Sequence, residues 1–228
     1  MTVATLLLLL AVGTAAGLDL VSGPQVLLAR PFVAGTLSGL VLGDPLTGIV
    51  VGATLELYAL EVLPVGATRY PDHGPGTVGA VWLGSTLSGA GALGVAVFAA
   101  LVTAGIGTRS LLLLRRANGA AITRAEGALA AGTPGVLARL QVGGALRDLA
   151  RSLAMTVVGL GVAALCRRFL PTQGPEAWRL SAVAIGAGAA GALVGAIRTA
   201  GRGPRLAVLT GGVAAGCVWT WLRATGGL

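Results

Sequence analysis

Long apolar runs separated by short polar segments cover most of the chain. The first run, residues 2–18, carries no charge and lacks the basic residues that open a secretory signal, so we expect a retained membrane helix. Two further runs, residues 31–43 and 45–60, contain 13 and 16 residues, whereas a helix needs about 20 to cross the hydrocarbon core of a bilayer. Because only Asp44 separates them, they predict a short or re-entrant helical hairpin.

A polar segment follows the predicted hairpin. Residues 61–76 contain three prolines and three glycines together with several polar side chains, so we expect no regular helix there. Residues 77–108 then carry no charge, and glycine and serine cluster within 85–94. This pattern predicts a pair of shorter membrane helices.

The character of the chain changes at residue 109. Residues 109–151 contain seven arginines against Glu126 and Asp148, and the positive-inside rule places such a segment on the cytoplasmic side. Its middle part alternates polar and apolar residues at roughly helical spacing, which predicts helices lying on the membrane face. A solvated loop without a partner is the alternative interpretation.

Three more apolar runs, at about 152–166, 179–197 and 206–222, complete the pattern. The chain is therefore predicted to be an all-α integral membrane protein: a polytopic helical bundle with short or re-entrant hairpins and a cytoplasmic amphipathic segment. We expect one permease domain over 1–228, with N-terminal membrane helices and a solute-site hairpin in 1–108, the arginine-rich segment in 109–151 and C-terminal membrane helices in 152–228. Glycines repeat at four-residue spacing in the first hairpin, which lets helix backbones approach closely: Gly35, Gly39, Gly43, Gly48 and Gly52.

The composition excludes several kinds of chemistry. The chain has no lysine, so neither a P-loop nucleotide site nor a Schiff base is available, and one histidine with two isolated cysteines cannot supply a zinc or iron–sulfur site. We therefore expect no cofactor and no metal. A pI near 11.4 would suggest nucleic acid in a soluble protein, but on a membrane chain cytoplasmic loops explain it.

Two acidic residues stand in or beside the predicted hairpin. Asp44, followed by Pro45, has the pattern of a helix N-cap, and a capped helix end within a membrane hairpin is also a place where a transporter presents polar groups to a solute. Glu56 lies in the middle of an apolar run, where an unpaired carboxylate costs about 2.5–3.5 kcal/mol to insert. Two interpretations are open. Glu56 either faces a solute and binds its hydroxyls together with nearby Thr54, or it pairs with a remote arginine and so fixes the packing.

A second polar cluster consists of Tyr70, Asp72 and His73. Asp72 is suited to bind a polyol and Tyr70 to pack against a sugar face, although a proline-rich loop also needs such residues in order to turn and to face water. His73 has no companion base, so we expect a loop residue and not a phospho-acceptor.

These residues lie in a recognisable order. The run RPFVAGTLSGLVLGDPLTGIVVGATLELYAL, followed by VGATRYPD, resembles the membrane subunit IIC of the mannose/fructose/sorbose family of the phosphoenolpyruvate-dependent sugar phosphotransferase system (PTS). The resemblance is strong over 30–72 and looser beyond. By position it implies solute-site roles for Asp44, Thr54, Glu56, Gly66 and Asp72, of which Glu56 and Asp72 would contact the sugar or its gate.

The resemblance also implies a biological setting. It predicts a multi-pass permease of the bacterial inner membrane that works with a IID membrane subunit, with IIA and IIB phosphocarrier proteins and with a hexose, and that forms homo-oligomers within a IIC–IID complex. The IIC subunit would carry no phosphorylated or catalytic residue. No nucleic-acid partner is expected.

Two other functions fit the sequence. The segment just before Arg30 contains few polar residues, and this scarcity favours a non-transporting or regulatory membrane partner of PTS components. A stand-alone secondary transporter would need a proton or sodium coupling site, for which Glu56 is the candidate.

Overall fold

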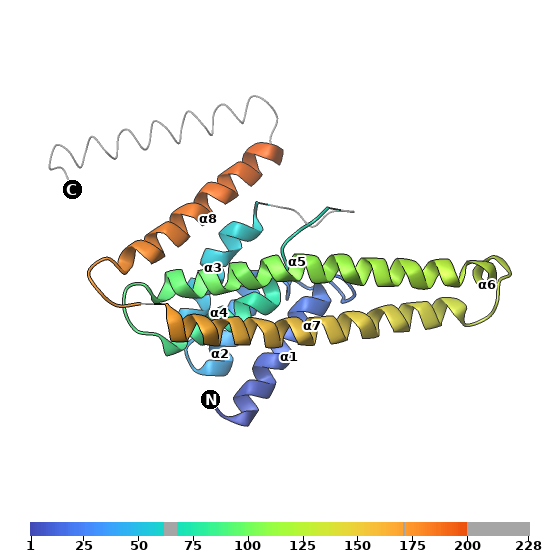
Figure 1. The fold of residues 1–228 in the computed structure, drawn as a ribbon, viewed down its shortest axis with the longest axis horizontal. Coiled ribbons are helices and arrows are strands. Elements are labelled where there is room, and N and C mark those ends of the chain that lie inside the picture. Colours follow the sequence, from blue (N-terminus) through green and yellow to red (C-terminus); the bar gives the residue numbers. More distant parts are fainter. Residues whose placement is uncertain (62–67, 171, 200–228) are drawn as a thin grey trace.

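The computed structural model describes residues 1–61, 68–170 and 172–199, and these residues form helices and connecting segments without a strand. Figure 1 shows a bundle from which one long helical hairpin projects. Three described helices, α5, α7 and α8, are long and apolar enough to cross a membrane, and α1, α2 and α3 are shorter apolar helices. The predicted all-α, multi-pass membrane architecture is confirmed. The helices are α1 (Val3–Asp19), α2 (Pro31–Leu42), α3 (Pro45–Ala59), α4 (His73–Thr86), α5 (Ala92–Arg124), α6 (Glu126–Ala130), α7 (Val136–Phe169) and α8 (Trp178–Thr199).

The predicted hairpin is formed by α2 and α3, which begin with Pro31 and Pro45. Gly43 ends α2 in the left-handed region (φ +73°), and the Asp44 carboxylate caps α3 by accepting a hydrogen bond of 3.2 Å from the Thr47 amide. The two helices touch through glycine. A Cβ atom on Gly48 would lie 2.5 Å from the Gly35 carbonyl oxygen, a distance that real Cβ atoms essentially never show.

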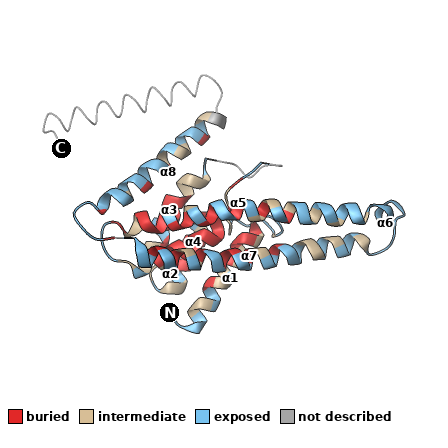
Figure 2. Cartoon of the chain, in the orientation of Figure 1, coloured by how far each residue is buried: buried red, intermediate tan, exposed pale blue. Residues whose placement is uncertain are grey.

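Helix α4 forms the centre of the bundle. It packs against α1, α2, α3, α5 and α7, and Figure 2 shows it as the most uniformly buried helix. Small residues permit this position, since a Cβ on Gly79 would lie 2.5 Å from the Gly159 carbonyl oxygen of α7. The helix starts at His73, so the expectation that all of 61–76 is irregular is wrong for its last four residues.

The predicted division at residue 109 does not coincide with the end of a helix. Helix α5 runs without a break through Arg109 to Arg124, and α7 starts at Val136, so the arginine-rich segment forms the outer halves of two long antiparallel helices joined by α6 (Figure 1). The increase in charge at residue 109 reflects a change of surroundings. It does not end the helix, because alanine, leucine and arginine are all good helix formers. The apolar run at 206–222 lies outside the described residues.

Arg151 of α7 is an exception within the arginine-rich segment, because its side chain is only 7% exposed. It donates to the Asp72 carboxylate at 2.5 Å, the Asp148 carboxylate at 2.9 Å and the Gly17 carbonyl of α1 at 3.1 Å. Two hydroxyls, Ser110 of α5 at 3.4 Å and Ser152 at 3.1 Å, accept further bonds. One guanidinium therefore joins α1, α5 and α7 to the start of α4.

Replacement of Gly48 by alanine tests the glycine contact of the hairpin. The added methyl group would collide with backbone that cannot rotate away, so we expect the Gly48→Ala protein to lose about 1–3 kcal/mol of stability. Gly105→Ala in α5 is the matched control, since a Cβ there meets nothing within 4 Å. Thermal unfolding in detergent compares the two, and equal midpoints would contradict the proposed close contact.

Replacement of Arg151 by methionine tests the buried ion cluster. Removal of one partner leaves two buried carboxylates without their cation, so we expect a loss of about 3–5 kcal/mol in chemical unfolding experiments. Arg179→Met is the control, because Arg179 and Glu176 form an ion pair with side chains 65% and 63% exposed. That pair contributes at most about 1 kcal/mol. A loss at Arg151 no larger than that at Arg179 would rule out the joining role.

Candidate functional site

A cavity of about 250 Å³ lies where the segment after α1, the start of α2, the end of α3 and the start of α4 meet. This volume is near the lower end of small-molecule sites. Its wall combines apolar residues such as Leu27 and Pro71 with polar ones. The polar residues that line it are Asp19, Gln25, Arg30, Tyr58, Tyr70 and His73.

Asp19, at the end of α1, shapes the segment that forms one wall. Its side chain accepts hydrogen bonds from the backbone amides of Val26 at 2.7 Å and Ala29 at 3.1 Å, and the residue is only 3% exposed. Within this segment the backbones of Gln25 (φ 56°) and Leu27 (φ 70°) adopt the left-handed conformation that residues other than glycine rarely take. Both line the cavity, so the strained backbone lies at the site itself.

Glu56 forms an ion pair with Arg30, the residue that precedes α2. Its other carboxylate oxygen accepts a hydrogen bond of 3.1 Å from the Phe32 amide. Arg30 lines the cavity and Glu56 does not. The structure therefore shows the second arrangement considered for Glu56, a carboxylate paired with a remote arginine. Glu56 contributes to the cavity wall only indirectly, because it holds the Arg30 guanidinium that lines it.

Asp72, Thr54 and Asp44 also lie outside the cavity wall. Asp72 turns its carboxylate toward Arg151, while its neighbours Pro71 and His73 line the cavity. The Thr54 hydroxyl donates to the Val50 carbonyl of its own helix at 2.8 Å, and Asp44 caps α3. Gly66 lies outside the described residues. The structure thus brings Tyr70, the segment around Asp72 and the partner of Glu56 to the cavity, whereas the side chains of Glu56 and Asp72 lie outside its wall.

Tyr70 and His73 come from the predicted second polar cluster. Tyr70 is buried, with the Arg115 guanidinium carbon 5.2 Å from its ring centroid. His73 is the first residue of α4 and is 8% exposed, so its predicted place in a loop is wrong. Both of its ring nitrogens are buried and have no hydrogen-bond partner in the part of the chain that the structure describes.

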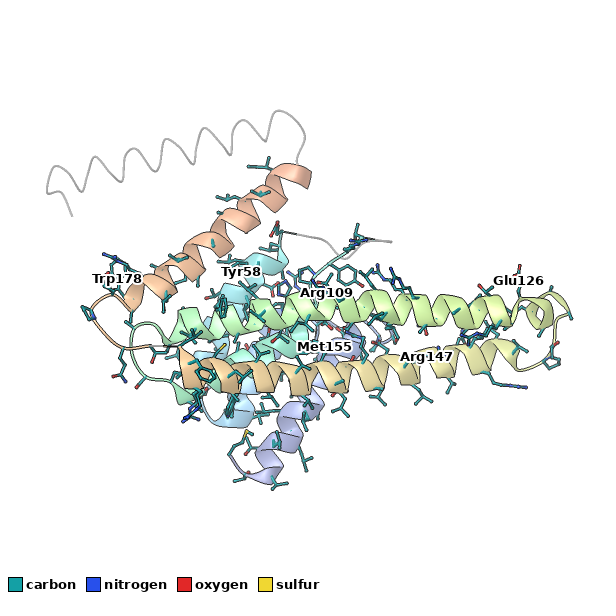
Figure 3. The ribbon with its side chains drawn as sticks, in the orientation of Figure 1. Tyr58, Arg109, Glu126, Arg147, Met155 and Trp178 are labelled. Atoms are coloured by element: carbon teal, nitrogen blue, oxygen red, sulfur yellow. The ribbon has the colours of Figure 1, made fainter. Side chains whose placement is uncertain are left out.

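Tyr58, labelled in Figure 3, closes the wall from α3. Its hydroxyl donates to the Ala184 carbonyl of α8 at 2.6 Å, so the cavity wall is connected to the C-terminal part of the described chain. Tyr58 and Asp19 were missed by sequence reasoning. A signal existed for Asp19, which is the first acid of the chain and directly follows the uncharged run at 2–18.

The arrangement is suited to a small polar solute. Guanidinium, imidazole, phenol and amide groups surround apolar surface, as in sites that bind a solute through both hydrogen bonds and packing. Among the described residues, no group of three histidine, cysteine, aspartate or glutamate side chains could hold a metal ion.

Comparison with known proteins gives a consistent result. The family model described as the PTS system sorbose-specific IIC component matches residues 2–197. The sorbose-specific EIIC component of Lacticaseibacillus casei is 54% identical over 43 residues, 19% of this chain and 16% of that protein. The fructose permease IIC component of Bacillus subtilis is 47% identical over 76 residues, 33% of this chain and 28% of that protein. The matched segments thus span less than a third of either relative.

Solved structures show the same fold. A chain from the structure of the mannose transporter ManYZ in complex with microcin E492 aligns with a TM-score of 0.62 and 24% identity, over 99% of this chain and 95% of that one. A second chain, described only as a membrane protein, aligns with a TM-score of 0.67 and 24% identity over the same shares. Since the family model extends over most of the chain, the chain belongs to the family of sorbose-specific IIC components of the phosphotransferase system.

Proposed function

We propose that the chain is the sugar-translocating IIC subunit of a mannose/fructose/sorbose-type PTS in the bacterial inner membrane. In this proposal it works with a IID subunit, accepts a hexose in the cavity beside α1–α4, and depends on IIA and IIB for phosphorylation of the sugar. The observation that carries the proposal is the cavity with its polar wall inside the bundle of a IIC-family chain.

The position of His73 supports the division of labour between subunits. It is the one histidine of the sequence and its ring nitrogens are buried, so a phosphocarrier protein could not bring a phosphoryl donor to it without opening the bundle. The residues that carry the phosphoryl group would therefore belong to the partner proteins. Homo-oligomers within the IIC–IID complex remain a prediction.

Reconstitution tests the function. Proteoliposomes containing this chain, its IID subunit and the soluble PTS proteins should accumulate phosphorylated sorbose, fructose or mannose only when phosphoenolpyruvate is supplied. Absence of uptake for all three sugars would favour a non-transporting partner. Uptake that persists without IID or phosphoenolpyruvate would favour a secondary transporter.

Glu56→Gln tests the ion pair at the cavity wall. The amide cannot neutralise Arg30, so the guanidinium loses its anchor and the cavity gains an uncompensated charge; we expect uptake at low sugar concentration to fall at least about tenfold. Glu176→Gln, in the exposed pair with Arg179, should leave uptake unchanged.

A double variant separates the pair from other effects of Glu56. If the two side chains act as a unit, Arg30→Gln combined with Glu56→Gln should reduce uptake little more than the worse of the single changes. Strictly additive losses, or full uptake in Glu56→Gln, would sink the assignment.

A further inference from the structure

His73 differs from three of the other polar residues that line the cavity, Asp19, Arg30 and Tyr58. Both Asp19 oxygens accept backbone hydrogen bonds, Arg30 pairs with Glu56, and the Tyr58 hydroxyl donates to Ala184. These side chains are already paired within the protein. The Nδ1 and Nε2 atoms of His73 have no hydrogen-bond partner within the described residues, although the residue is only 8% exposed.

An unpaired imidazole in such a place is costly. A neutral imidazole carries one donor and one acceptor, and a buried polar group left without a partner loses the hydrogen bonds that it would make in water. An imidazole in a protein interior is therefore normally paired. Because His73 lines the cavity, a molecule that enters the cavity would meet this side chain.

The backbone around His73 is held in place by contacts on both sides. The preceding residue, Asp72, is held by Arg151, and the His73 carbonyl accepts a hydrogen bond of 2.8 Å from the Thr77 hydroxyl. The following residue, Gly74, touches α1, since a Cβ there would lie 2.9 Å from the Ala16 methyl group. The start of α4 is thus fixed on both sides of His73, as expected for a preorganised binding group.

We propose that His73 hydrogen-bonds one hydroxyl group of the solute in the cavity and so helps to determine which sugar binds. A hydroxyl both donates and accepts, so it can pair with an imidazole nitrogen in either tautomer, whereas a carboxylate can pair only with the protonated nitrogen. Leu27, Pro71 and the Tyr70 ring supply apolar surface for the carbon skeleton of the solute. This assignment rests on the proposed function.

The test uses the chain purified together with its IID subunit. Binding of sorbose, fructose, mannose and N-acetylgalactosamine is measured first, and monodeoxy analogues of the tightest-binding sugar are then compared. We expect removal of one hydroxyl to weaken binding about tenfold in the wild-type protein. In His73→Phe, which keeps a ring of similar size without nitrogens, the parent sugar should bind about tenfold more weakly and that same deoxy analogue should bind as tightly as the parent.

A structural role of His73 would give the opposite pattern. It would weaken all sugars equally, leave each deoxy penalty intact and lower the thermal midpoint of the sugar-free protein. Our proposal predicts an unchanged or higher midpoint for sugar-free His73→Phe, because two unpaired buried nitrogens are removed, and a smaller rise on addition of sugar. Thr86→Val, at the other end of α4 and outside the cavity wall, is the control and should keep every penalty.

The outcomes separate the two proposals. If none of the four sugars binds the wild-type complex, the proposed function fails and the assignment of His73 falls with it. If a sugar binds and every deoxy penalty persists in His73→Phe, the assignment of His73 alone is overturned. Should His73→Phe not fold, His73→Gln replaces it: its amide should give a changed penalty at one hydroxyl, and unchanged penalties throughout would overturn the assignment.

Discussion

The buried guanidinium of Arg151 is the interaction on which the arrangement of this bundle depends. A charge in an apolar interior must be paired and fully hydrogen-bonded, and Arg151 meets this demand with groups from α1, α5, α7 and the residue that precedes α4. Each of these elements is therefore fixed relative to one side chain. Since Asp72 is one of the partners, the cluster also sets the direction in which its neighbours Pro71 and His73 face the cavity.

A second ion pair fixes the other side of the cavity. Arg30 and Glu56 come from the two arms of the α2–α3 hairpin, whose axes approach closely because glycines face each other between them. The hairpin thus brings the end of α3 next to the start of α2. In both pairs the carboxylate acts as a counterion behind the wall, and the cavity itself is lined by an arginine, aromatic rings and an imidazole.

The sequence predicted those features that depend on neighbouring residues. The turn Gly43–Asp44–Pro45 contains its own stop, cap and start signals, and the apolar runs marked α1, α2 and α3 to within a residue or two. Features that depend on distant residues were not predictable. The charges after residue 109 do not mark the end of a helix, because α5 continues through them. Likewise, nothing near His73 in the sequence reveals that other helices bury it.

The partner of Glu56 illustrates why Glu56 and Asp72 lie close to the cavity and yet outside its wall. An acid inside an apolar helix signals that something nearby must compensate it, but the signal does not distinguish a solute from an arginine 26 positions earlier in the chain. Once the arginine is present, the carboxylate is neutralised, and it is the arginine that lines the cavity. The same reasoning applies to Asp72, where the compensating cation draws the carboxylate out of the wall and its neighbour His73 faces the cavity. In this bundle the two acids therefore mark the position of the cavity, while the cation of one and the sequence neighbours of the other form its wall.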